Sequence, residues 1–181
     1  ISNFTKNVEM IFNKKRDLLI VVGGGSLPPQ LYDRPHEDEL QPNRDRMEEQ
    51  VIHYCVAHGI PIIATCRGMQ YINVMFGGKL WYHPKLPVNR TRGVDHQVWL
   101  VKEQRNIWVN NYHSDCIYEE GLASCFEPLA IDRENHVVEA YGSDEMKILA
   151  LQWHPERRFE TANAYEETRK IILDFIQKYV K

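Results

Sequence analysis

Short continuous apolar runs and one amphipathic stretch alternate along the first part of the chain. Residues 17–22 and 61–65 are rich in β-branched side chains without polar alternation, which is typical of strands buried on both faces of a parallel sheet. Between them, residues 44–58 place apolar side chains at helical spacing and end before Gly59, in a position where glycine commonly closes a helix. The order strand, helix, strand predicts an α/β domain.

The second half of the chain has a different pattern. Its short segments of β-branched and aromatic residues follow one another at hairpin-like spacing and predict further strands, at residues 96–101, 107–112, 126–132, 136–141 and 147–153. A last helix is predicted over residues 162–179, where apolar side chains recur at alternating steps of three and four. We therefore expect residues 1–181 to form a single domain, α/β at first, then mainly β, and closed by a helix.

Composition and charge exclude some classes of partner. The 181 residues suffice for one domain with a sizeable core, and 43% hydrophobic and 26% charged residues are ordinary globular values. The net charge is −3 and there is no basic run, so no nucleic-acid partner is expected. No apolar stretch approaches the ~20 residues of a membrane-spanning helix, so no membrane partner is expected either. The chain begins with Ile1, and we expect an N-terminal strand-helix-strand unit to be missing from it.

The four cysteines, Cys55, Cys66, Cys116 and Cys125, show neither a CxxC pair nor the dense spacing of a disulfide framework. The sequence also contains no HExxH motif and no paired Cys/His spacing, so neither a metal nor a cofactor is expected. Because one of these thiols is a candidate nucleophile, the reducing cytoplasm is the expected compartment.

Cys66 stands where the second apolar run turns into a helical pattern. A strand, a sharp turn and a helix form a nucleophile elbow, which lifts a side chain above the carboxyl edge of a parallel sheet. Ala64 and Gly68 flank the cysteine at two residues on each side, as the tight backbone of such a turn requires. On this stretch alone, a buried structural cysteine explains the residue equally well.

A second candidate feature is the glycine run that follows the first predicted strand. Gly23, Gly24 and Gly25 would let backbone N–H groups approach a ligand closely. The run matches neither GxGxxG nor the phosphate-binding loop, so a nucleotide site is not indicated. The alternative is a flexible loop without chemistry.

A cysteine nucleophile needs a base, and the base needs a group that orients it. His154 follows the last predicted strand and should emerge at the carboxyl edge of the sheet, with Glu156 two residues further on to accept a hydrogen bond from the imidazole. His113 closes another predicted strand beside polar residues and is the rival base.

Three of these segments, in this order, resemble the class I glutamine amidotransferase superfamily: Gly23-Gly24-Gly25-Ser26, Cys66-Arg67-Gly68-Met69-Gln70 and Trp153-His154-Pro155-Glu156. Together with Asn111-Tyr112-His113, they are most similar to its γ-glutamyl hydrolase branch, which is peptidase C26-like and includes γ-glutamyl-γ-aminobutyrate hydrolases. The chain departs from the pattern at Ala64-Thr65, where the superfamily has glycine and then isoleucine or valine.

The resemblance implies a flavodoxin-like, three-layer αβα fold with a mostly parallel central sheet and additional antiparallel strands. It implies a catalytic triad of Cys66, His154 and Glu156 that acts through a γ-glutamyl thioester. It also implies an oxyanion hole from the backbone N–H groups of Gly24 or Gly25 and of Arg67. The positions that would hold the glutamyl amino and carboxylate groups are Gln70, Asn111, Tyr112, His113 and Ser114, with Asp115 next to them.

The expected substrate is a small γ-glutamyl amine, and a nucleotide-activated amine is one option for the group released. The loops at residues 27–43 and 83–95 would shape that side of the pocket. Within the second loop, Arg90 and Arg92 are either partners for a phosphate or carboxylate or ordinary solvated surface. Two other functions stay open: a glutaminase subunit that passes ammonia to a separate synthase, and a non-catalytic binding domain of the same fold. A homodimer is compatible with the sequence.

Overall fold

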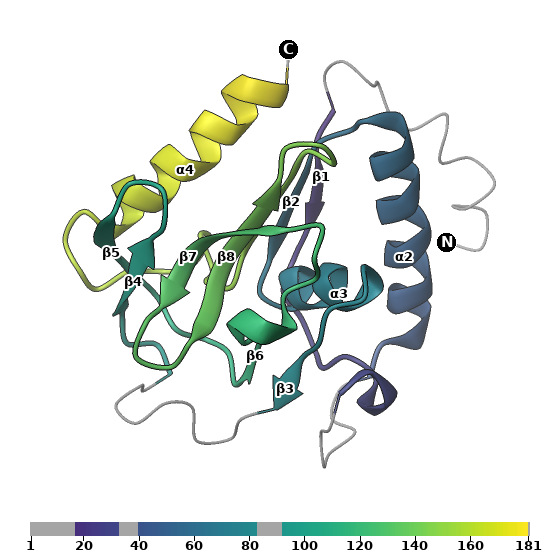
Figure 1. Ribbon diagram of the computed structural model, residues 1–181, viewed down its shortest axis with the longest axis horizontal. Coiled ribbons are helices and arrows are strands. Elements are labelled where there is room, and N and C mark those ends of the chain that lie inside the picture. The colour runs from purple at the N-terminus through teal and green to yellow at the C-terminus, as the bar shows by residue number, and fades with distance from the viewer. Residues whose placement is uncertain (1–16, 33–39, 83–91, 181) are drawn as a thin grey trace.

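A seven-stranded sheet forms the centre of the computed structural model, which describes residues 17–32, 40–82 and 92–180 (Figure 1). Its strand order is β1-β2-β9-β8-β7-β4-β5. The strands are β1 (Leu19–Val21), β2 (Ile62–Thr65), β4 (His96–Leu100), β5 (Arg105–Val109), β7 (Glu127–Asp132), β8 (Val137–Ser143) and β9 (Ile148–Leu151). Two further strands, β3 (Trp81–Tyr82) and β6 (Asp115–Cys116), pair separately in antiparallel fashion.

Three strands form the parallel part of the sheet. β2 lies between β1 and β9 and pairs in parallel with both, so that Ile63 faces Ile20 on one side and Leu149 on the other. Every residue of β2 and β9 is buried, which explains why both segments are continuous apolar runs rather than alternating ones. The parallel arrangement brings the carboxyl ends of β2 and β9 to the same edge of the sheet.

The other strand pairs of the large sheet are antiparallel. β9 pairs with β8, β8 with β7, β7 with β4, and β4 with β5. The additional antiparallel strands expected are present, and their pairs outnumber the parallel ones. Each of the tight turns after β4, β7 and β8 returns the chain beside the strand it has just left. The predicted α/β fold is confirmed, and its parallel part is the part that carries Cys66 and His154.

Helices cover both faces of the sheet and give the three layers predicted (Figure 1). α2 (Pro42–His58) and α3 (Arg67–Met75) pack on one face, where Val51 and Ile72 join a core with Ile62 and Ala150. α4 (Ala164–Tyr179) packs on the other face through its apolar stripe, which comprises Ile171, Ile172, Phe175 and Ile176. Successive residues of β9 contribute to opposite cores, as the two-residue period of a strand requires.

The predicted helices agree with the observed ones to within a few residues. α2 ends at His58 with Gly59 in the left-handed conformation (φ 64°), as expected from the sequence. Two single-turn 3₁₀ helices, Pro29–Leu31 and Glu119–Gly121, complete the secondary structure. Parts of the two loops expected to shape the pocket, residues 33–39 and 83–91, lie outside the described residues, as does Arg90. Within the described part of the chain, no helix has the length and apolar character to cross a bilayer.

Candidate active site

Cys66 occupies the sharp turn between β2 and α3. Its backbone adopts φ 49° and ψ −111°, a conformation that L-residues rarely adopt and that nucleophile elbows use. Hydrogen bonds on both sides hold the turn: the Cys66 N–H donates to the Leu151 carbonyl at 2.8 Å, and the Gln70 N–H donates to the Cys66 carbonyl at 3.1 Å. The predicted strand, turn and helix are confirmed. Ala64, where the superfamily pattern has glycine, is fully buried just before this turn.

The thiol of Cys66 is buried at the N-terminus of α3. Burial raises its pKa to about 11, although the backbone N–H of Arg67 bonds to the sulfur and lowers that pKa in part. The negative charge of Asp115 also raises it. The resting protein therefore holds a neutral thiol at pH 7, and attack on a substrate requires a base that removes the proton as the bond forms.

His154 lies just beyond β9, at the carboxyl edge that also carries Cys66. A buried amide fixes its backbone: the His154 N–H donates to Oδ1 of Asn110 at 2.9 Å, and Nδ2 of Asn110 donates to the His154 carbonyl at 2.9 Å. The ring packs edge-on against Tyr112, with 5.7 Å between the centroids. The imidazole therefore has a defined position before any ligand is bound.

The carboxylate of Glu156 contacts this imidazole. Nδ1 of His154 lies 2.6 Å from Oε1 of Glu156, so Nδ1 carries the proton toward the carboxylate and Nε2 is the nitrogen left for proton transfer. Partial burial alone would raise the pKa of Glu156, but the hydrogen bond with His154 and the charge of Arg157 bring that pKa below its usual value. The pair has the geometry of the base and orienting acid expected for a cysteine nucleophile.

Gly23 shows that Cys66 and His154 lie beside the same small space. A Cβ added to this glycine would lie 2.8 Å from Cε1 of His154 and 3.6 Å from Cβ of Cys66. A side chain at position 23 would therefore push directly into the imidazole. The glycine run therefore lies at the site. The sequence alone was equally compatible with a flexible loop that has no catalytic or binding role.

A cavity of about 220 Å³ opens beside Cys66. Eight of the residues predicted for the site line it: Gly24, Gly25, Cys66, Arg67, Gln70, Tyr112, His113 and Ser114. The predicted residues His154 and Glu156 are not among the lining residues, and neither is Asn111, which is a neighbour of the lining. Its side chain is buried, and its backbone carbonyl accepts a hydrogen bond from Gly93 at 2.7 Å. The cavity is predominantly polar, as a pocket for a charged amino-acid group requires.

His113 lines this cavity in an arrangement that does not suit the rival base. Its Nδ1 lies 3.0 Å from the backbone carbonyl oxygen of Asp115, and its Nε2 lies 3.7 Å from the buried carboxylate of Glu139. His96 approaches the same carboxylate from another side, at 3.4 Å. Both ring nitrogens of His113 thus face oxygen atoms of the protein, whereas His154 has its Nδ1 paired with a carboxylate and lies at the sheet edge that carries Cys66.

Two charged residues complete the cavity. Asp115, which ends the segment expected at the glutamyl-binding positions, and Arg92 bring charges of opposite sign to it, and the hydroxyl of Tyr32 donates to Asp115 at 3.0 Å. Sequence reasoning left Arg92 open between surface and anion partner, and the structure places it on the cavity. Asn110 was not predicted as a site residue, because nothing in a local pattern shows that an amide after one strand will bind the backbone after another strand.

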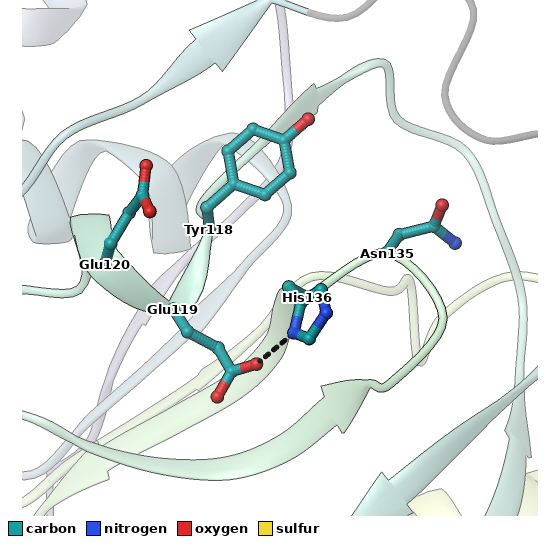
Figure 2. A pocket seen from close by; sticks show the side chains of 5 residues that line it. All are labelled: Tyr118, Glu119, Glu120, Asn135 and His136. Carbon is teal, nitrogen blue, oxygen red and sulfur yellow. Dashed lines mark hydrogen bonds and ion pairs between the residues drawn. The ribbon is translucent and has the colours of Figure 1, made fainter.

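A second hollow lies away from Cys66, beside the 3₁₀ helix Glu119–Gly121 (Figure 2). Figure 2 shows the carboxylate of Glu119 directed at the ring of His136, and the two are 3.1 Å apart. Both side chains are largely exposed, and the hollow contains no cysteine or other strong nucleophile. Among the described residues, no cluster of histidine, cysteine and acidic side chains could hold a metal ion, here or at Cys66.

Comparison with known proteins agrees with this geometry. The chain is 30% identical over 164 residues to the glutamine amidotransferase-like protein YvdE of Lactococcus lactis, with 80% of this chain and 68% of the relative covered. It is 26% identical over 175 residues to the gamma-glutamyl-gamma-aminobutyrate hydrolase PuuD of Escherichia coli, with 82% and 67% covered. The crystal structure of a glutamine amidotransferase from Thermotoga maritima superposes with a TM-score of 0.56 at 20% identity, over 88% of this chain and 64% of that one. At that identity the likeness concerns the fold alone.

The chain spans about two thirds of the length of the Lactococcus and Escherichia relatives and 53% of a Mycobacterium tuberculosis relative. The sequence model of the family described as Peptidase C26 matches residues 5–156, a range that runs from before β1 to Glu156. It includes the elbow, the glycine run and the His154–Glu156 pair. By that match and by its fold, the chain belongs to the Peptidase C26 family of glutamine amidotransferase-like proteins.

Proposed function

We propose that this protein hydrolyses the γ-glutamyl amide bond of a small γ-glutamyl amine and releases glutamate. The observation that carries the proposal is the 2.6 Å contact between His154 and Glu156 at the sheet edge where Cys66 stands in its elbow. A buried cysteine without such a neighbour would be explained by packing alone. The gamma-glutamyl-gamma-aminobutyrate hydrolases among the relatives support the γ-glutamyl bond as the target.

In the proposed reaction, the sulfur of Cys66 attacks the side-chain carbonyl carbon of the glutamyl group. Nε2 of His154 accepts the thiol proton as the C–S bond forms, and Glu156 stabilises the imidazolium. The imidazolium then gives its proton to the departing amine, which leaves a γ-glutamyl thioester on Cys66. Water attacks the thioester after losing a proton to His154, and the thiol recovers that proton when glutamate departs.

The tetrahedral intermediates of both steps carry a negative oxygen. The backbone N–H of Arg67, at the first turn of α3, and the N–H groups of Gly24 and Gly25 are the donors that would stabilise it. One such donor is typically worth ~3 kcal/mol of transition-state stabilisation. The short turn after β1 and the elbow after β2 thus supply the two sides of one oxyanion hole.

The charges of the cavity fit the amino-acid end of a glutamyl group. Asp115 suits the α-ammonium, while Arg92 suits the α-carboxylate, and Gln70, Tyr112, His113 and Ser114 supply polar groups between them. Gln70 is itself held in place, since its Nε2 donates to the Asp115 carbonyl at 3.0 Å and to Gln152 at 3.1 Å.

A screen of γ-glutamyl amines, with glutamine as the comparison substrate, tests the proposal. We expect release of glutamate and free amine, and Cys66→Ala should lower the rate by at least ~10⁴-fold while the melting temperature stays near that of the unaltered protein. Mass spectrometry after rapid acid quenching should detect a γ-glutamyl adduct on Cys66. An active Cys66→Ala variant would refute the mechanism. Turnover of glutamine alone, with ammonia as the product, would favour a glutaminase subunit instead.

A further inference from the structure

A cluster of charged side chains on α2 contacts both sides of the site. Nη2 of Arg44 donates to the carbonyl oxygens of Val22 at 2.7 Å and Gly23 at 3.1 Å. These two carbonyls belong to the peptide units that lead into the glycine run. A Cβ on Gly24 would collide with the Arg44 guanidinium, so the loop lies directly against this side chain. Arg44 therefore fixes the orientation of the backbone that presents the Gly24 and Gly25 N–H groups.

Arg67 lies on the opposite side of the site from the glycine run. Its backbone N–H bonds to the sulfur of Cys66, and its side chain is buried, with 2% of it exposed. There Nη1 lies 2.6 Å from Oε2 of Glu48, and Nη2 contacts Oδ1 of Asp45. The first residue of α3 is thus attached to α2 by two ion pairs.

Glu48 is the residue that joins the two sides. Its Oε2 binds Arg67 at 2.6 Å, and its Oε1 accepts from Nε of Arg44 at 2.6 Å. One carboxylate therefore connects the arginine that holds the glycine run to the arginine that follows the nucleophile. We propose that Glu48 is a positioning residue of the oxyanion hole, which sets the spacing between the Gly24–Gly25 donors and the Arg67 N–H.

This inference rests on the proposed function, and its physical basis is the accuracy that oxyanion donors require. Donors act only when they lie within a few tenths of an ångström of the developing charge, and the two sides here come from chain segments more than 40 residues apart. The cluster contains two guanidinium groups and two carboxylates, so its charges balance in a mostly buried setting. Replacing the carboxylate by an amide turns one of the two acceptor atoms into an NH₂ group that faces an arginine.

The test compares Glu48→Gln with Glu49→Gln in the full chain. Glu49 is the adjacent residue of α2 and is exposed, so its variant is a matched loss of one charge. Two reactions of Cys66 are measured at pH 9: hydrolysis of L-γ-glutamyl-p-nitroanilide, which forms an oxyanion, and alkylation by iodoacetamide, which does not. Peptide mass spectrometry follows alkylation at Cys66 itself, because the exposed thiol of Cys125 will react with iodoacetamide as well.

We expect Glu48→Gln to lower kcat for the anilide by about 10- to 100-fold, with KM within about threefold and the alkylation rate within about twofold of the unaltered protein. Glu49→Gln should change none of these quantities. An unchanged kcat in Glu48→Gln would overturn the proposal, and so would an equal loss in both reactions, because that result indicates general damage to Cys66.

A second variant and a second measurement keep the inference testable if Glu48→Gln does not fold or if no substrate is turned over. If Glu48→Gln does not fold, Arg44→Lys replaces it, since lysine keeps the charge but cannot bind Glu48 and two carbonyls together. Hydrogen exchange at the amides of residues 23–26 should become at least about tenfold faster in either variant. Should the unaltered protein hydrolyse no γ-glutamyl amide, the proposed function fails, whereas faster exchange would still show that Glu48 positions the loop. Unchanged exchange in both variants would reject the inference by itself.

Discussion

At the scale of single residues, Cys66 combines two unfavourable properties. Its positive φ costs on the order of 1–3 kcal/mol, and its burial raises the thiol pKa to about 11. The surrounding contacts stabilise this conformation, chiefly the hydrogen bond from the Cys66 N–H to the Leu151 carbonyl and the packing of α3 on the sheet. A cysteine with a purely structural role would have no need of this backbone conformation, which favours the nucleophile over the packed thiol.

The raised pKa predicts how the resting thiol reacts. A thiol with a pKa of about 11 remains protonated at neutral pH, so iodoacetamide alkylation of Cys66 should accelerate about tenfold per pH unit between pH 7 and pH 9.5. Substrate turnover should not follow this slope, because His154 removes the proton during attack. Cys66-specific alkylation measured by mass spectrometry checks the prediction. A plateau that begins below pH 8 would indicate a thiolate–imidazolium pair in the resting protein and contradict it.

The sequence was sufficient to predict those site residues that have a recognisable local pattern around them. Cys66 is marked by the change from an apolar run to a helical pattern, and His154 with Glu156 by their place after the last buried run. The residues that support them have no such mark, because Glu48 and Arg67 are 19 positions apart and Asn110 and His154 are 44 apart. Which partners meet over such separations depends on strand order, which the hydrophobic pattern leaves undetermined.

At the scale of elements, the site is built where several strands end. β2 delivers Cys66, β9 delivers His154, and the segment after β5 delivers Asn110 and Tyr112. Asn110 is fully buried, and its amide satisfies both backbone groups of His154. The segment after β5 therefore reaches across to the parallel part of the sheet, although β5 itself lies at the far edge.

Removing the Asn110 amide should affect stability and catalysis together. Asn110→Ala leaves the N–H of His154 buried without a partner, while the His154 carbonyl keeps the N–H of Arg157 as a donor at 3.1 Å. The loss should lower the free energy of unfolding by roughly 1–3 kcal/mol. We expect kcat to fall by at least about tenfold, since His154 loses its fixed position. Urea unfolding and steady-state kinetics measure the two effects. Asn106→Ala, at an exposed position of β5, is the control. A loss of stability without a loss of kcat would limit Asn110 to a structural role.

The elements themselves were predicted better than their pairing. All the long strands and the helices were expected near their observed positions, because buried strands and amphipathic helices have distinct periods. β6 was missed, since a two-residue strand such as Asp115–Cys116 has no period to detect. The extent of antiparallel pairing was left open by the sequence, because alternation indicates which face of a strand is buried and does not indicate which neighbour it pairs with.

At the scale of the whole molecule, α4 covers one face of the sheet and is held at both ends by charged contacts. Near its beginning, Glu167 forms a two-point ion pair with Arg105 of β5, at 3.0 and 2.6 Å. Near its end, Asp144 accepts from Lys178 at 2.7 Å and from Tyr179 at 2.6 Å. The apolar stripe of α4 supplies the burial between these ends, where its side chains join the second core.

These contacts predict how acid affects the fold. The hydrogen bonds to Lys178 and Tyr179 lower the pKa of Asp144, and the one from Arg105 lowers the pKa of Glu167. A carboxyl whose pKa is lower in the folded state stabilises it above its ordinary pKa, and that contribution is lost as the pH falls through the folded value. The unfolding free energy should therefore decrease as the pH falls from about 5.5 to 3.

The double variant Asp144→Asn/Glu167→Gln isolates this contribution. Its unfolding free energy should be lower than that of the unaltered protein at pH 6 and decline less steeply below pH 5. The two proteins should become similar near pH 3, as the carboxyl groups of Asp144 and Glu167 in the unaltered protein become protonated and lose their charge like the amides of the variant. Urea unfolding at each pH, monitored by tryptophan fluorescence, measures the difference. Glu49→Gln/Glu134→Gln removes two exposed carboxylates outside these contacts and should keep the original slope. If the two double variants had the same pH dependence, the charged contacts of α4 would contribute nothing specific, and the apolar stripe alone would hold the helix on the sheet.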